Sequence, residues 1–194
     1  MAMYSDNGFI SIFMGPMFSG KTSQLCRITE QYDIAGRHSC VIKNSKDVRY
    51  DVDETGDIII SHSGSVLKES SNIKIVVVNE FDEIDRKILL ESDAIFIDEG
   101  QFFSGVGKFA SLWRSYNKHV YISCLDGDYK KRPFSEIVPL LPESEYIQKL
   151  HAICMLCKNN IASFTMKIID EDDDSQIRVG GKETYAAVCH KCHR

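Results

Sequence analysis

A stretch near the start of the chain fits the phosphate-loop pattern GxxxxGK[ST] in full, as Gly15-Pro16-Met17-Phe18-Ser19-Gly20-Lys21-Thr22. In this pattern the glycines let backbone N–H groups turn toward phosphates, while the N-terminus of the following helix adds a positive potential. Lys21 then reaches the β- and γ-phosphates, and Thr22 offers its hydroxyl to Mg²⁺. The stretch therefore predicts binding of a nucleoside triphosphate together with Mg²⁺.

Two adjacent carboxylates form the second group that could do chemistry. Asp98 and Glu99 directly follow the apolar run Ala94-Ile95-Phe96-Ile97, and a phosphate-loop protein needs an acidic site at the end of another strand. We expect Asp98 in the Mg²⁺ shell and Glu99 facing the phosphoryl acceptor. Glu99 could act as a general base on an organic hydroxyl, as in a kinase, or orient water, as in an ATPase. The two carboxylates alone therefore do not distinguish a kinase from an ATPase.

Four cysteines form the third group, spaced as Cys154-x₂-Cys157 and Cys189-x₂-Cys192. Each CxxC turn can present two thiolates to one ion, so the spacing predicts tetrahedral zinc, with a sizeable loop between the two pairs. A redox role is the rival for one pair, but two pairs favour metal. Four thiolates leave no open coordination position, which makes the zinc structural. Three nearby histidines are expected not to be ligands: His151, His190 and His193.

The elements that must position these groups follow from apolar patterns. The run from Phe9 to Met14 predicts a buried strand before the phosphate loop. After the loop, Leu25, Ile28, Tyr32 and Ala35 recur at helical spacing, and Gly36 stands where a helix C-cap would be. Further strands are predicted at 40–42, 73–78, 94–97 and 120–124, alternating with helical patterns around 82–90 and 106–116. This alternation predicts an α/β fold, a largely parallel sheet flanked by helices.

Two segments interrupt that alternation. Residues 47–71 are polar, apart from Ile58-Ile59-Ile60, and predict a long connection with one hairpin strand. From about His151 the CxxC pairs bracket an acidic run, Asp170 to Asp174, and then Gly180-Gly181. We therefore predict two domains: a phosphate-loop nucleotide-binding α/β domain over 1–149 and a small zinc-binding domain over 150–194.

The composition of the 194 residues is ordinary for a globular protein, with 43% hydrophobic and 26% charged residues. A net charge of −5 offers no broad basic face to nucleic acid, and no apolar run approaches the roughly 18 residues of a membrane span. We expect a cytoplasmic chain without membrane or nucleic-acid partners. In a reducing compartment, isolated cysteines in apolar segments are packing residues, here Cys26, Cys40 and Cys124.

Two other function classes stay open at this point. A phosphate-loop ATPase or GTPase switch would use Glu99 to orient water and residues 47–71 as its switch region. A zinc-knuckle module touching nucleic acid would use the basic residues Lys130 to Arg132 and Lys158, although the acidic total opposes it. The identity of the product separates kinase from ATPase, and salt-dependent binding tests the third class.

Several motifs taken together resemble one known family. They are Gly15 to Thr22, Asp47-Val48-Arg49-Tyr50, Asp98-Glu99-Gly100-Gln101-Phe102-Phe103, the Leu125-Asp126-Gly127 turn and Arg132-Pro133-Phe134. In order and spacing they are similar to the zinc-containing type II thymidine kinases of animals, bacteria and large DNA viruses, from about Gly8 to Cys192. The two CxxC pairs and Val179-Gly180-Gly181 with Tyr185 fit the same family.

The resemblance implies transfer of the γ-phosphoryl group of ATP to the 5′-hydroxyl of thymidine. Glu99 is then the base that takes the hydroxyl proton, and in-line attack follows. Alignment and charge neutralisation by Lys21, Mg²⁺ and Arg49 supply most of the catalysis. The other positions implied to contact ATP or Mg²⁺ are Gly15, Pro16, Met17, Phe18, Ser19, Gly20, Thr22, Asp47, Asp98 and Gln101.

The resemblance also implies how the nucleoside is bound. Side chains expected to shape the thymine pocket are Met17, Phe102, Leu125, Tyr129 and Phe134. A lasso bonding the base edge through its backbone is implied for Gln176, Ile177, Arg178, Val179 and Gly180, with Tyr185 closing it and Thr165 nearby. The structural zinc, held by Cys154, Cys157, Cys189 and Cys192, would anchor that lasso.

Three features depart from the family pattern. Tyr129 stands where similar enzymes often have phenylalanine, Arg178 stands where some have an aliphatic residue, and Asp170 to Asp174 make the approach to the lasso acidic. A buried tyrosine hydroxyl without a partner costs about 1 to 3 kcal/mol, so it must find one on the nucleoside or on water. The resemblance further implies a homotetramer, dTTP as feedback inhibitor, and the host cytoplasm as location for a viral protein.

Overall fold

The computed structural model describes residues 7–47, 66–169 and 180–193, together with the backbone of 58–60. The helices are α1 (Lys21–Ile34), α2 (Arg86–Glu91) and α3 (Val106–Ser115), with 3₁₀ turns η1 (Phe81–Glu83), η2 (Gly100–Phe102) and η3 (Val138–Glu143). The strands are β1 (Phe9–Met14), β2 (Ser39–Asn44), β3 (Ile58–Ile60), β4 (Val66–Lys68), β5 (Ile73–Val78), β6 (Ala94–Ile97), β7 (His119–Cys124), β8 (Tyr146–Lys149), β9 (Ala152–Ile153), β10 (Ile161–Ala162), β11 (Phe164–Lys167) and β12 (Tyr185–Val188).

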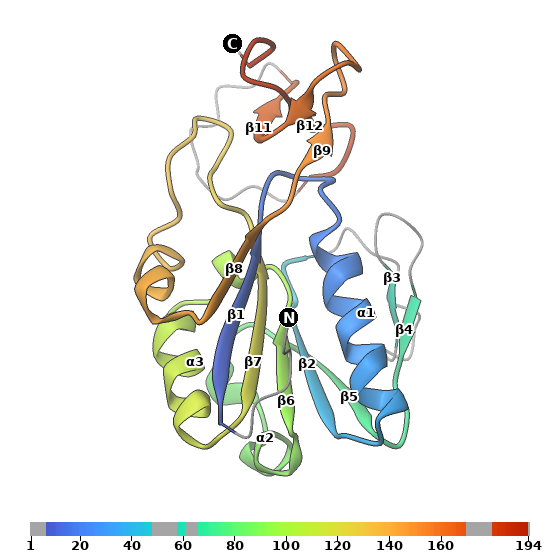
Figure 1. Ribbon diagram of the computed structural model, residues 1–194, viewed down its shortest axis with the longest axis vertical. Helices are drawn as coiled ribbons and strands as arrows, with labels where there is room; N and C mark the ends of the chain where they lie inside the picture. Colours follow the sequence, from blue (N-terminus) through green and yellow to red (C-terminus); the bar gives the residue numbers. More distant parts are fainter. Residues whose placement is uncertain (1–6, 48–57, 61–65, 170–179, 194) are drawn as a thin grey trace.

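A six-stranded sheet forms the centre of the fold, in the order β5-β2-β6-β7-β1-β8 (Figure 1). All its neighbouring strands are parallel, which confirms the predicted α/β class. Because parallel strands end at the same edge, the residues after β1, β2, β6 and β7 come together there. This is the edge to which the phosphate loop and the two carboxylates belong.

Alternate residues of each strand bury two separate apolar layers. On one face Ile12, Ile42 and Ile122 pack with Val106 and other residues of α3. On the opposite face Phe13, Val41, Phe96 and Tyr121 pack with Leu25, Ile28 and Tyr32 of α1. The four central strands β1, β2, β6 and β7 therefore bury apolar side chains on both sides, as expected for a parallel sheet covered by helices on each face.

The predicted helices occur, with one difference in extent. Around the predicted 82–90 pattern, α2 covers only Arg86–Glu91, because Asp85 caps it by accepting a hydrogen bond from the N–H of Lys87 at 2.9 Å. The residues before Asp85 instead make the short turn η1. Among the described residues, no helix is long and apolar enough to cross a membrane.

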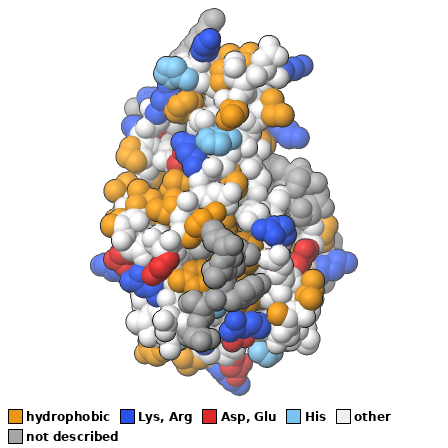
Figure 2. Space-filling model, viewed as in Figure 1, with side chains coloured by type: hydrophobic (Ala, Val, Ile, Leu, Met, Phe, Trp, Pro, Cys, Tyr) orange, Lys and Arg blue, Asp and Glu red, His pale blue; other side chains and the backbone are white. Residues whose placement is uncertain are grey.

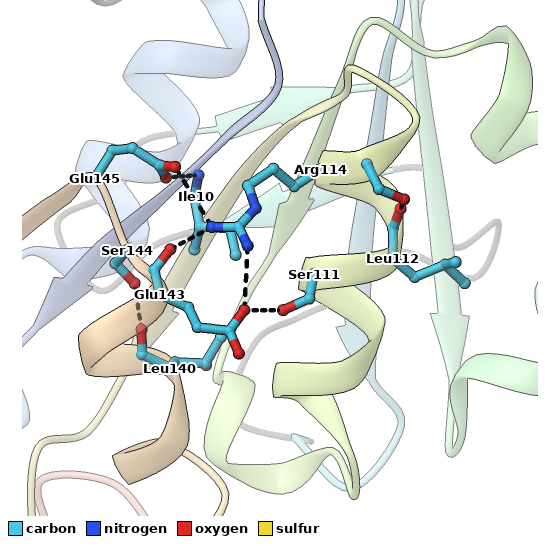
Figure 3. Close-up of polar contacts among 9 residues, drawn as sticks. Ile10, Ser111, Leu112, Arg114, Leu140, Glu143, Ser144 and Glu145 are labelled. Atoms are coloured by element: carbon cyan, nitrogen blue, oxygen red, sulfur yellow. Dashed lines mark hydrogen bonds and ion pairs between the residues drawn. The ribbon is translucent and has the colours of Figure 1, made fainter.

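The edge strand β8 is an element that sequence patterns did not predict. It pairs with β1, with Ser11 opposite Tyr146, and its start is fixed by contacts that Figure 3 draws. Glu145 accepts from the N–H of Ile10 at 2.7 Å. Arg114 of α3 donates to the Glu143 carbonyl at 2.6 Å and lies 3.4 Å from the Glu145 carboxylate. These contacts tie α3 and β1 to the segment that leads into β8.

After β8 the chain builds a small unit from two antiparallel pairs, β9 with β10 and β11 with β12. In Figure 1 this unit lies over the end of the large sheet where the phosphate loop follows β1. Its apolar cluster contains Ala162 and Val188, and Phe18 of the phosphate loop packs against that cluster. Elsewhere β3 and β4 pair antiparallel, so two strands lie within 47–71, where one hairpin strand was expected.

Candidate active site

The phosphate loop takes its shape from three residues with positive φ. Gly15 has φ 150°, and a Cβ there would lie 2.3 Å from the carbonyl oxygen of Leu150. Phe18 has φ 62° and Gly20 has φ 85°, directly before α1 begins at Lys21. The loop thus bends tightly against the main chain after β8, and only glycine fits at position 15.

The two polar residues that begin α1 are both buried. Lys21 donates from Nζ to the carbonyl of Pro16 at 2.8 Å, so its ammonium group lies back over the loop. Thr22 donates from Oγ1 to the Oδ1 of Asp98 at 3.2 Å. The structure therefore brings the phosphate loop together with the first of the two predicted carboxylates.

Asp98 is the most deeply buried acidic group of the site, with 1% of its surface exposed. Its Oδ1 also accepts from the hydroxyl of Ser123, whereas its Oδ2 has no hydrogen-bond partner among the described residues. Burial, and next the charge of Glu99, raise the pKa of Asp98 to about 6. Mg²⁺ prefers oxygen ligands, and a buried carboxylate oxygen without a hydrogen-bond partner, next to the hydroxyl of Thr22, fits two of its coordination positions.

Glu99 lies directly beside Asp98 and is also buried. Its backbone has φ 50°, the left-handed region that residues with a Cβ rarely adopt. Its N–H donates to the hydroxyl of Ser123 at 3.3 Å, and its Oε2 accepts from the side chain of Gln101 at 2.5 Å. Gln101 in turn accepts from the N–H of Leu125 at 3.0 Å. Gln101, which is expected to contact ATP or Mg²⁺, donates a hydrogen bond to the side chain of Glu99.

Two residues of the site escaped sequence reasoning. Ser123 lies inside the predicted strand 120–124, where its hydroxyl was not recognised as a link between the carboxylates. Lys43 is 2% exposed at the end of β2, and its charge lowers the pKa of Asp98. Its position directly after the predicted strand 40–42 was a signal that could have identified it. Ile42 of β2 lies opposite Ile97 of β6. Lys43 and Asp98, which follow these two residues, are therefore neighbours at the ends of the two strands.

Asp47, expected beside the phosphates, is buried, and its charge raises the pKa of Asp98, so these two carboxylates share one site. Its N–H donates to the Asn44 carbonyl at 3.0 Å, which turns the chain just after β2. Arg49, expected with it, lies outside the described residues. The described part of the site thus joins four chain segments: the phosphate loop, the end of β2, the end of β6 and β7.

Among the residues expected to bind the nucleoside, Met17 and Thr165 are in direct contact. The N–H of Met17 donates to Oγ1 of Thr165 on β11 at 3.1 Å, a direct bond between the two parts of the chain. Met17, Phe134, Thr165 and Tyr185 are buried, while Phe102, Leu125 and Tyr129 are partly exposed. The lasso residues Gln176, Ile177, Arg178 and Val179 lie outside the described residues, which resume at Gly180.

Tyr129 lies among basic side chains. The Nζ atoms of Lys130 and Lys167 are each 5.6 Å from the centre of its ring. Its carbonyl accepts from Nε2 of His193 at 3.0 Å. The loop after β7 is therefore attached to the C-terminal unit by its main chain, while the tyrosine ring has cations on its face.

The four predicted zinc ligands meet in the C-terminal unit. The Sγ atoms of Cys154, Cys157, Cys189 and Cys192 all lie within 4.8 Å of one another, and those of Cys157 and Cys189 are 3.9 Å apart. A tetrahedral ion with Zn–S bonds of about 2.3 Å needs sulfur atoms about 3.8 Å apart. Over the part of the chain that is described, no histidine or carboxylate joins the group. The donor set fits a structural zinc.

Backbone bonds shape each pair into a knuckle. Lys158 N–H donates to the Cys154 carbonyl at 2.9 Å, and His193 N–H donates to the Cys189 carbonyl at 3.1 Å. Met155 N–H donates to the Ala187 carbonyl at 2.9 Å, which attaches the first knuckle to β12. The isolated cysteines Cys26, Cys40 and Cys124 are buried, as predicted, and burial raises the pKa of the Cys26 thiol to about 12.

Comparisons with known proteins match nearly the whole chain. The family described as "Thymidine kinase" matches residues 8–193. Yaba monkey tumor virus "Thymidine kinase" is 38% identical over 191 residues, covering 98% of this chain and 97% of the relative. Mimivirus of Acanthamoeba polyphaga has a "Thymidine kinase" 38% identical over 188 residues, covering 94% and 80%. "Thymidine kinase 1" of Dictyostelium discoideum is 34% identical over 186 residues, covering 96% and 78%.

Among solved structures, the flagellar accessory protein FlaH from Methanocaldococcus jannaschii is 11% identical, with a TM-score of 0.47. The alignment covers 87% of this chain and 75% of that protein. A likeness at this level supports no argument about the fold, which rests on the sheet order described above.

Proposed function

The chain belongs to the thymidine kinase family, and on that premise we propose that it transfers the γ-phosphoryl group of ATP to the 5′-hydroxyl of thymidine, giving dTMP and ADP. One observation carries the proposal beyond family membership. The phosphate loop and the Asp98–Glu99 pair form one buried cluster, joined by the 3.2 Å bond from Thr22 to Asp98. A phosphoryl donor site and a candidate base therefore adjoin each other.

Within this site we assign Glu99 as the general base. Its carboxylate is buried and held by Gln101, and its backbone is fixed by Ser123, so it can meet a hydroxyl in one orientation. Proton removal from the 5′-hydroxyl would accompany in-line attack on the γ-phosphorus. Phosphoryl transfer needs mainly alignment and charge neutralisation, which we assign to Lys21, the helix N-terminus and Arg49.

Asp98 and Thr22 would hold Mg²⁺, which when bound would neutralise negative charge on the phosphates. The Oδ2 of Asp98, which has no hydrogen-bond partner among the described residues, supports this assignment. Asp47 adds a further carboxylate to the same cluster. The chain's own contribution is to keep these oxygens buried and oriented before the nucleotide arrives.

For the nucleoside we propose a pocket between the phosphate loop and the C-terminal unit. The Met17–Thr165 bond and the packing of Phe18 against the cysteine cluster support this, because they bring β11 and the cysteine-bearing cluster next to the loop. The zinc would fix both ends of residues 158–188, so that the lasso residues 176–180 can order over the base. Tyr129 and Arg178 are where we expect base preference to differ within the family.

We also propose the two-domain division at residue 149, a homotetramer, dTTP as feedback inhibitor and a cytoplasmic location, the host cytoplasm for a viral protein. The oligomer is supported by exposed apolar side chains, of which Ile153 and Ile161 face each other across β9 and β10 and are 72% and 67% exposed. Light scattering of the purified zinc-bound protein tests the oligomeric state.

The deciding experiment measures ATP-dependent conversion of thymidine to dTMP by the purified protein, beside deoxycytidine. Glu99→Gln keeps the size of the side chain and removes the base, so we expect dTMP formation to fall by at least about 100-fold. Glu91→Gln, at the exposed end of α2, is the control that should retain activity. ATP loss without any nucleoside product would replace the kinase by the ATPase alternative.

A further inference from the structure

Ser123 is a fully buried residue that no phosphate-loop motif includes. It lies on β7 two residues after Tyr121, so both side chains project toward the face covered by α1. Its hydroxyl makes two hydrogen bonds at once. It donates to Oδ1 of Asp98 and accepts from the N–H of Glu99 at 3.3 Å. One oxygen atom therefore contacts both carboxylate-bearing residues of the site.

We propose that Ser123 is a positioning residue that sets the metal-binding carboxylate and the general base relative to each other. The inference rests on the proposed function, since it assigns Asp98 to Mg²⁺ and Glu99 to proton transfer. A hydroxyl has one donor and two acceptor sites. The donor holds the side chain of Asp98, and one acceptor holds the main chain of Glu99. A movement of the Asp98 side chain therefore shifts the Ser123 hydroxyl, and with it the main chain of Glu99.

The hydrogen bond to Asp98 decides which of its oxygens can bind a cation. Oδ1 receives hydrogen bonds from both Ser123 and Thr22. Oδ2 has none among the described residues. A carboxylate with both donors on one oxygen is fixed in its rotation and presents the other oxygen. Without the Ser123 hydroxyl, only the longer bond from Thr22 remains on that oxygen.

The hydrogen bond to Glu99 acts on a backbone in a sparsely populated conformation. A φ of 50° at a residue with a Cβ persists only where the surroundings determine it. Ser123 supplies the partner of the buried N–H at that position. The pairing of β6 with β7, in which Ile97 lies opposite Ile122, places the serine beside the turn after β6. The alignment of β6 with β7 therefore fixes the main chain of Glu99 through the hydroxyl of Ser123.

The test compares Ser123→Ala with Ser39→Ala. Ser39 is a matched control because it is also a buried serine of the same sheet, but it lies at the start of β2, away from the carboxylates. The first measurement is Mn²⁺ binding in the presence of ADP, followed by electron paramagnetic resonance. The second is the kinetics of dTMP formation at saturating Mg²⁺. ADP binding without divalent cation reports whether the phosphate loop is intact.

We expect Ser123→Ala to bind Mn²⁺ about 10-fold more weakly and to lose about 10- to 100-fold in kcat, the range found when a partner of a metal ligand is removed. The KM for thymidine should change by less than about threefold, and metal-free ADP binding should match the wild type. Ser123→Thr, which keeps the hydroxyl, should restore most of the Mn²⁺ affinity. A buried serine with only a packing role would not produce this pattern.

Equal Mn²⁺ affinity and equal kcat for Ser123→Ala and Ser39→Ala would overturn the inference. If Ser123→Ala is less stable, binding is compared at a temperature where urea unfolding shows both variants to be folded. A wild-type protein that forms no dTMP would refute the proposed function instead. The Mn²⁺·ADP comparison would still decide whether Ser123 positions Asp98, so the two failures are distinguishable.

Discussion

The burial of Asp98 leads to a prediction about stability: Asp98→Asn should make the metal-free protein more stable while abolishing its activity. Burial, and then the neighbouring charge of Glu99, raise the pKa of Asp98 from 3.8 to about 6. A carboxyl group with a higher pKa in the folded state binds protons more strongly there than in the unfolded chain. Folding therefore loses stability as the pH rises through this range, and asparagine removes that loss.

The size of the effect follows from the difference in pKa. One pKa unit corresponds to about 1.4 kcal/mol, so a rise from 3.8 to about 6 amounts to at most about 3 kcal/mol. The buried amide of asparagine also needs acceptors, which reduces the gain. We expect Asp98→Asn to exceed the wild type by about 1 to 3 kcal/mol above pH 6. The difference should shrink between pH 6 and 4, where Asp98 becomes protonated in the folded protein.

Urea-induced unfolding of both proteins at several pH values between 4 and 8 measures this difference. Zinc is kept bound and no Mg²⁺ is added, because a bound cation would stabilise only the wild type. Asp82→Asn, at an exposed carboxylate in η1, is the control and should show no such trend. A free-energy difference between Asp98→Asn and wild type that stays constant from pH 4 to 8 would refute the reasoning.

Three further outcomes are expected. Lys43→Met removes a cation that lowers the pKa of Asp98, so the acidic limb of the pH profile of kcat/KM should move to higher pH, whereas Lys43→Arg should leave it in place. Gly15→Ala should lower the free energy of unfolding in urea by more than about 1 kcal/mol, because its Cβ would lie 2.3 Å from a carbonyl oxygen. Gly36→Ala is the control: Gly36 also has a positive φ but has open space around it, so this variant shows the cost of backbone strain without the clash. Chelation of zinc should weaken ADP binding measured by calorimetry, because Met17 and Phe18 of the phosphate loop contact the C-terminal unit that the four cysteines hold together. Unchanged ADP affinity would show that this unit does not support the loop.

The parts of the fold that sequence patterns predicted are those with strong local signals. The strand before the phosphate loop is apolar on both faces, and α1 follows a glycine that takes a left-handed conformation. The paired CxxC spacing likewise predicted four sulfur atoms that the structure gathers within 4.8 Å. The strand, the helix start and each single CxxC pair lie within a few neighbouring residues, and the need of one zinc ion for four thiolates joins the two pairs across the segment between them.

What could not be predicted depends on residues far apart in the chain. β8 has four residues of mixed polarity after a turn containing Pro139 and Pro142, so it has no strand pattern of its own. Its position depends on β1 and on Arg114 of α3. Ser123 similarly gains its place from the alignment of β6 and β7. Alignment between strands is not encoded in the spacing of either one.

The order of strands in the sheet also has a consequence for how the protein is made. β1 leaves the ribosome first, but both of its neighbours, β7 and β8, come from residues beyond 118. The strand that carries the phosphate loop therefore has no partner in the sheet until residues 119–124 of β7 have been translated. A nascent chain arrested before β7 exposes an apolar strand with unpaired edges, so we expect such fragments to need chaperones and to bind no nucleotide.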